Sequence, residues 1–113
     1  MTKIQETAQK LAVKFNTLNG DSQAVLDPAT ILTFAQIILD LFTKIKECKQ
    51  NKSQATQTIK SPGLFHRLQL RMHLRNILGR DFKNSGENMV QSVLEVGKQL
   101  TPDDVSALYD EAD

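Results

Sequence analysis

The sequence has few cysteine and aromatic residues, and each scarcity excludes a class of protein. The one cysteine, Cys48, cannot form an internal disulfide, so nothing in the sequence marks a secreted domain built on disulfides. The chain has no tryptophan and only six aromatic residues, so its core must be mostly aliphatic. A chain of 113 residues fits one domain and can bury such a core without disulfides or metals. We predict that Cys48 is a small core residue at the edge of an apolar helix face.

Long hydrophobic runs are also missing. None approaches the ~20 apolar residues that span a bilayer, because Thr33, Gln36, Asp40 and Thr43 interrupt the longest stretch. Residues 1–6 are amphipathic and do not resemble a signal peptide. We therefore expect no membrane contact and a location in the cytoplasm of the cell that makes or hosts the protein, or in a virion.

The motifs of metal and catalytic sites are absent from the sequence. His66 and His73 are seven positions apart, which on a helix separates them by about 10 Å, too far for one zinc ion. The five glycines are scattered and form no phosphate-binding fingerprint. The Asp103–Asp104 pair is explained by its place at the start of a helix. We predict no metal, no cofactor, no small-molecule substrate and no enzymatic activity. An enzyme with catalytic residues scattered along the chain stays open as a third reading, since such residues leave no local trace.

What the sequence does contain is helical periodicity along most of its length. A first helix is expected from a Thr2 cap to Asn19-Gly20, and a second from Asp27-Pro28 to about Gln50. The apolar residues of 28–50 cover an arc of roughly 220°, too wide for one neighbour. This helix is therefore either the centre of the bundle or a contact with another chain. Leu32 and Leu39, at one side of its apolar arc, are the candidate contact residues.

Four more segments complete the predicted helices. Ser53 is expected to cap a short helix through Lys60, and a long helix is expected over 64–78, stopped by Gly79. Residues 81–85 are expected to form a loop anchored by Phe82, with Ser85 capping the next helix. A last helix begins at Thr101-Pro102. No segment shows the alternation of a strand. The sequence predicts an all-α protein, a single domain over 1–113, built as an irregular bundle of four to six helices around a central apolar helix at about 28–50.

The distribution of charge is the strongest remaining signal, because the net charge of +1 is the sum of a strongly basic region and an acidic C-terminal region. Residues 44–83 carry ten basic residues against two acidic ones, a local net charge of +8, whereas the last thirteen residues carry five acids and no base. Three interpretations are open. The acidic tail folds over the basic region, the basic region binds nucleic acid, or it binds the tail of another copy. The candidate nucleic-acid-binding residues are Lys44, Lys49, Lys52, Arg80 and Lys83.

The helix over 64–78 is the most unusual segment. Arg67, Arg71 and Arg75 follow one another at four-residue intervals and form one ridge, with apolar residues on both sides. A solvated basic face is not normally framed by leucines, and guanidinium groups in such a frame usually snorkel or meet carboxylates or phosphates. We expect carboxylates from the acidic tail as partners, supplied by Asp103, Asp104, Asp110 and Glu111. The pattern predicts an interaction surface.

The function that the sequence favours is that of a non-catalytic interaction or assembly protein, a small structural component of a larger complex such as a phage particle. It would bind a protein partner or a second copy of itself. The residues expected to carry this contact are Arg67, Arg71, Arg75, Leu32 and Leu39. The alternative is a nucleic-acid-binding accessory protein that uses the basic region 44–83. Specific reading of DNA by a helix-turn-helix is disfavoured, because residues 53–60 are too weakly apolar to support a recognition helix.

Overall fold

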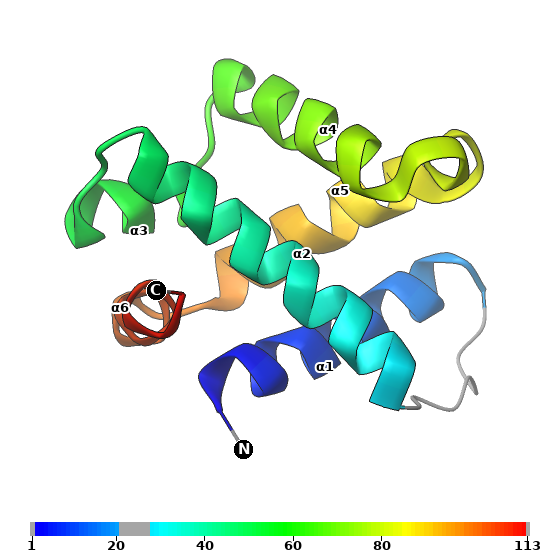
Figure 1. Cartoon of the computed structure of the whole chain (residues 1–113), viewed down its shortest axis with the longest axis horizontal. Helices are drawn as coiled ribbons and strands as arrows, with labels where there is room; N and C mark the ends of the chain where they lie inside the picture. Colours follow the sequence, from blue (N-terminus) through cyan, green and yellow to red (C-terminus); the bar gives the residue numbers. More distant parts are fainter. Residues whose placement is uncertain (1, 21–27, 113) are drawn as a thin grey trace.

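Six α-helices and one short 3-10 helix make up the computed structural model, which describes residues 2–20 and 28–112 and has no strand within these ranges (Figure 1). This architecture confirms the predicted all-α fold with up to six helices. The elements are α1 (Lys3–Leu18), α2 (Pro28–Glu47), α3 (Lys52–Lys60), α4 (Leu64–Leu78), η1 (Gly79–Asp81), α5 (Phe82–Gln99) and α6 (Pro102–Glu111).

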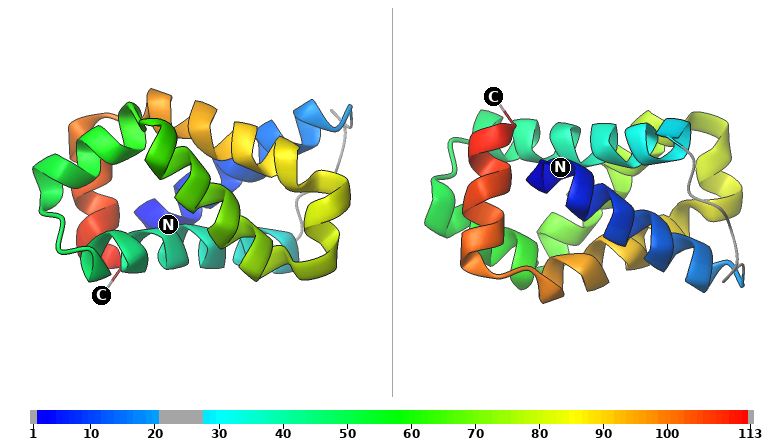
Figure 2. Two further views of the ribbon diagram at one scale, coloured as in Figure 1. Left: turned by 90° about the horizontal axis from the view of Figure 1, so that it is seen from above. Right: turned by 90° about the horizontal axis from the view of Figure 1, so that it is seen from below.

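Two long helices, α2 and α5, form opposite sides of the molecule (Figure 2). Helix α1 crosses between them on one face and packs on both, whereas α4 crosses on the other face and packs mainly on α5. Helices α3 and α6 pack against each other and close one end. The apolar α2 is therefore not the only central helix among the described elements, because α5 contacts α1, α3, α4 and η1.

Helix starts are set by capping boxes at three places. Thr2, Asn51 and Thr101 each accept a hydrogen bond from the backbone N–H three residues on, and the side chain at that position accepts one from the cap's backbone N–H. Thr2 and Thr101 confirm the prediction. The predicted cap at Ser53 is wrong, because α3 already begins at Lys52, behind Asn51. The predicted cap at Asp27 lies outside the described residues.

The connection after α4 differs from the prediction. Gly79 ends α4 with a φ of 57°, as expected, but the predicted loop over 81–85 is wrong: α5 begins at Phe82 and Ser85 lies inside it. The reason is the packing of Phe82 against the core. Gly86, four residues on in the same helix, leaves room for its ring, since a Cβ on Gly86 would lie 2.3 Å from that ring. The core contact of Phe82 thus outweighs the weak helix propensity of this polar segment.

The core is aliphatic, as its composition requires. It is drawn from all six helices, and its innermost large side chains are Ile37, Leu74, Leu108 and Val105. Helix α3 approaches α5 closely where Gly97 lies against the carbonyl oxygen of Ile59. The prediction that Cys48 belongs to the core is wrong. Helix α2 ends at Glu47, and Cys48 lies exposed in the turn that follows.

Helix α2 has a further property that follows from its composition. Judged by length and hydropathy alone, it is the only described helix that could cross a membrane. The core helix of a soluble protein passes the same test, and α2 contributes six buried side chains to the core: Phe34, Ala35, Ile37, Ile38, Phe42 and Ile45.

Candidate protein-interaction surface

Helix α4 turns large apolar side chains toward solvent. Leu64, Phe65, Leu68 and Met72 are 77, 68, 53 and 64% exposed, and only Leu70 and Leu74 of this helix are buried. At about 100° per residue the four exposed side chains fall within an arc of roughly 100°, and we call them the α4 apolar strip. Of the two apolar sides expected from the sequence, the one with Leu70 and Leu74 packs on α5 and the other stays uncovered.

The arginine ridge predicted from the sequence runs along α4 beside this strip. Arg71 forms an ion pair with Glu87 of α5, and both side chains are largely exposed. The guanidinium group of Arg75 lies 5.4 Å from the centre of the Phe82 ring, a cation–π distance. Arg67 is exposed and forms no ion pair with the described residues. The ridge thus meets one carboxylate, but from α5 rather than from the acidic tail.

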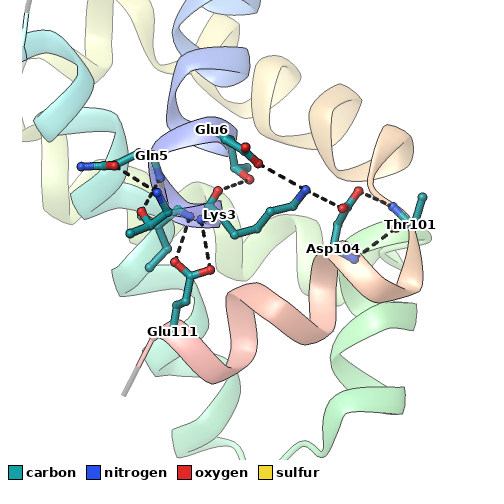
Figure 3. Close-up of polar contacts among 9 residues, drawn as sticks. Lys3, Gln5, Glu6, Thr101, Asp104 and Glu111 are labelled. Atoms are coloured by element: carbon teal, nitrogen blue, oxygen red, sulfur yellow. Dashed lines mark hydrogen bonds and ion pairs between the residues drawn. The ribbon is translucent and has the colours of Figure 1, made fainter.

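The acidic tail is neutralised elsewhere, at the N-terminus of α1 (Figure 3). The ammonium group of Lys3 lies 2.6 Å from Asp104 and 3.5 Å from Glu6. The carboxylate of Glu111 accepts hydrogen bonds from the backbone N–H groups of Lys3 and Ile4, where the helix dipole favours negative charge. The hydrogen bond from Lys3 and the backbone N–H of Thr101 lower the pKa of Asp104 to about 2, and Asp104 in turn raises the pKa of Lys3.

Asp110 pairs with Lys52 of α3, 2.9 Å away. Internal neutralisation of the tail is therefore found, as one of the three interpretations expected, but through α1 and α3. Within one chain, the expected partnership between the tail and Arg67, Arg71 and Arg75 is wrong for the described residues, because α6 packs on α1 and α3.

The polar side of α4 borders the opening of a cavity. His66, Gln69, His73 and Asn76 line one side of a cavity of about 330 Å³ that lies between α4 and α2, with walls from α3 and α5. Burial, and then the nearby charge of Lys44, lower the pKa of His73, so its imidazole is neutral at pH 7. Of the described residues, no three histidine, cysteine, aspartate or glutamate side chains are grouped to hold a metal ion.

The two candidate leucines of α2 lie away from the α4 apolar strip. Leu32 is 70% exposed and borders a shallow hollow between α2 and the start of α1. Leu39 borders the same hollow but is partly buried and packs against the core. The structure therefore leaves Leu32 on the surface and gives Leu39 a structural role.

The five candidate nucleic-acid-binding residues come from two parts of the fold. Lys44, Lys49 and Lys52 lie around the α2–α3 connection, where Lys44 pairs with Glu47 at 3.1 Å and Lys52 with Asp110. Arg80 and Lys83 lie in η1 and the first turn of α5. The five residues thus belong to separate elements, and two of them, Lys44 and Lys52, are already paired with carboxylates.

Comparison with protein families, curated proteins and solved structures finds no match for this chain.

Proposed function

We propose that this protein is a non-catalytic binding module that docks an acidic, amphipathic segment of another protein on the outer side of α4. The observation that carries the proposal is the α4 apolar strip, Leu64, Phe65, Leu68 and Met72, which stays more than half exposed beside a ridge of three arginines. Soluble monomers rarely expose contiguous apolar patches of this kind unless a partner covers them.

The phenylalanine, methionine and arginine residues of the α4 apolar strip and the arginine ridge are of the types enriched in the core of protein–protein interfaces. Leucine, phenylalanine and methionine provide apolar area. Arg67, Arg71 and Arg75 provide planar guanidinium groups, each of which can bind a carboxylate through two parallel hydrogen bonds. The strip follows the i, i+4, i+8 spacing of Leu64, Leu68 and Met72, which matches the row of side chains that one partner helix would cover.

Charge favours an acidic partner over a second copy of the chain. The protein's own acidic tail is held by Lys3, Lys52 and the N-terminus of α1, so it is not free to reach the ridge of another molecule. In a two-fold symmetric pair with antiparallel α4 helices, the two arginine ridges would lie along the same side of the contact and repel each other. A nucleic acid fits less well, since the remaining basic candidates belong to separate elements and two of them are already paired with carboxylates.

A designed helical peptide of about 18 residues tests this proposal, with leucines on one face and glutamates along its flank. We expect micromolar binding in fluorescence anisotropy, weakened at least tenfold by Phe65→Ser with Leu68→Ser and three- to tenfold by Arg71→Ala with Arg75→Ala. The matched control is Leu32→Ser, which removes an equally exposed leucine of α2 and leaves the affinity unchanged. The same peptide with lysine in place of glutamate should not bind.

Three results would overturn the proposal. The first is peptide affinity that is unchanged by the double serine variant. The second is a dimer in sedimentation velocity that Leu68→Ser dissociates, which assigns the surface to a second copy. The third is binding to a 20-base-pair duplex with a steep salt dependence that Arg71→Ala flattens, which assigns it to nucleic acid.

A further inference from the structure

The cavity between α2 and α4 is partly open to solvent and has a volume of about 330 Å³. A closed engineered cavity of about 150 Å³ lined by apolar side chains already binds benzene. The cavity between α2 and α4 therefore reaches the lower end of the volumes found for ligand pockets.

The cavity is apolar at its base and polar at its mouth. Its base is formed by side chains that belong to the core, among them Leu11, Ile38, Phe42, Leu70, Leu100 and Leu108. Its mouth carries the polar stripe of α4, His66, Gln69, His73 and Asn76, opposite Lys44 and Gln50. These four α4 residues are spaced three, four and three apart, so they follow one side of the helix and all reach the same opening.

The groups at the mouth suit an uncharged head better than an ion. Gln69 and Asn76 offer amides that both donate and accept, and His73 is held neutral. The positive charge of Lys44 is balanced by its ion pair with Glu47. Asp40, which also faces His73, adds a negative charge close to the opening. An anionic head would meet the carboxylates of Asp40 and Glu47 there, and a charged head of either sign would have to give up hydration that an uncharged head does not need to lose.

We propose that this cavity binds a small amphiphile, with an apolar body about the size of two fused rings and an uncharged, hydrogen-bonding head such as a hydroxyl or amide. The body fills the apolar base and the head remains at the mouth among Gln69, Asn76 and His73. This site is separate from the α4 apolar strip, since the two lie on different sides of α4 and share only Met72.

A matched series of probes tests the assignment: 2-naphthol, naphthalene without a head, and 2-naphthoate with a charged one. Calorimetry, together with NMR shifts of the cavity methyl groups, gives the affinities. We expect 2-naphthol to bind at least fivefold tighter than either analogue. The Gln69→Leu/Asn76→Leu variant should remove the preference for 2-naphthol over naphthalene, and both positions are exposed, so the fold is retained.

A cavity-filling variant provides the second test. Val93→Trp places an indole in the cavity and should weaken 2-naphthol at least tenfold, whereas Val13→Trp on the exposed side of α1 should leave it unchanged. Leu68→Ser should also have no effect, which separates this site from the peptide-binding surface. The proposal is overturned by absence of 2-naphthol binding up to 1 mM, by an affinity that Val93→Trp leaves intact in a folded protein, or by tighter binding of 2-naphthoate. A head-group preference that survives in Gln69→Leu/Asn76→Leu would overturn it equally.

Discussion

Lys3 and Asp104 join the first helix to the last through a contact of 2.6 Å between ammonium and carboxylate (Figure 3). Asp104 also accepts the backbone N–H of Thr101 at 2.9 Å, so one carboxylate both caps α6 and binds α1. These contacts favour its ionised form, which is why its pKa falls to about 2.

This pair makes stability depend on acidity in a defined range. The folded pKa of Asp104 lies below its ordinary value of 3.8, so its contribution is complete above about pH 5 and disappears as the pH falls through 3.8 toward 2. We expect Asp104→Asn to lower the free energy of unfolding by about 1 kcal/mol at pH 7, a value limited by solvent screening, and by much less at pH 2. Urea denaturation at pH 7, 4 and 2 measures this difference. Exposed Asp103 provides the control, since Asp103→Asn should change little at any of these pH values; an equal loss for Asp104→Asn at pH 7 and pH 2 would contradict the assignment.

Gly97 sets how closely α3 and α5 approach. A Cβ there would lie 2.7 Å from the carbonyl oxygen of Ile59, a backbone atom that cannot move without shifting α3. We expect Gly97→Ala to destabilise the protein by about 1–3 kcal/mol, as overpacking does. Gly63→Ala is the control, because no atom lies within 4 Å of its added Cβ; Gly63 is the N-cap of α4, so its replacement should cost less than about 1 kcal/mol. Thermal melts of both variants distinguish them, and equal melting temperatures would show that the α3–α5 contact is adjustable.

Leu32 and Leu39 are expected to respond differently to the same change. Leu39→Asp places a charge against the core and should lower the free energy of unfolding by about 2 kcal/mol or more, whereas Leu32→Asp on the exposed side of α2 should change it by less than about 0.5 kcal/mol. Guanidinium denaturation gives both values. A stable Leu39→Asp monomer that has lost an oligomer seen in the parent would instead return Leu39 to an interface.

The ion pair of Arg71 with Glu87 should contribute little to stability. Both side chains are close to half exposed or more, so we expect a coupling of less than about 1 kcal/mol in a double-mutant cycle with alanine at both positions. The coupling should shrink further in 0.5 M salt. A coupling above 3 kcal/mol would mean that the pair is buried, for example in an assembly.

The helices that the sequence predicted correctly are those with an unambiguous start or stop. Thr2, Pro28, Gly79 and the Thr101-Pro102 pair each have one local interpretation, and the structure follows it. The start of α3 was ambiguous because Asn51 and Ser53 are both good caps. The sequence feature that decides between them is Gln54, three residues after Asn51, which completes the capping box. The start of α5 could not be predicted from local sequence, because it depends on Phe82 packing against the core formed by other helices.

The arginine ridge and its apolar flanks were predicted from residue spacing alone, but the cavity was not. Helix α4 has apolar residues on two sides, and the sequence does not say which side the rest of the protein will cover. Once Leu70 and Leu74 pack on α5, the rotation of α4 about its axis is fixed. That rotation turns His66 and His73 toward α2 and leaves Leu64 and Leu68 outside. The partners of the acidic tail were mispredicted for the same reason: they depend on which helices α6 packs against.

The sparse attachment of α4 has a consequence for its motion. Its buried side chains are Leu70 and Leu74; Ile77 and Leu78 pack against the core only at its C-terminal end, and the cavity lies between α4 and α2. Its amide hydrogens should therefore exchange with deuterated solvent through local opening, well before those of α1 and α5, which pack on more of the other helices. Because α4 forms one side of the cavity mouth, local opening of α4 would also widen that mouth. A ligand bound in the cavity should therefore slow hydrogen exchange of the α4 amides and leave exchange in the other helices unchanged.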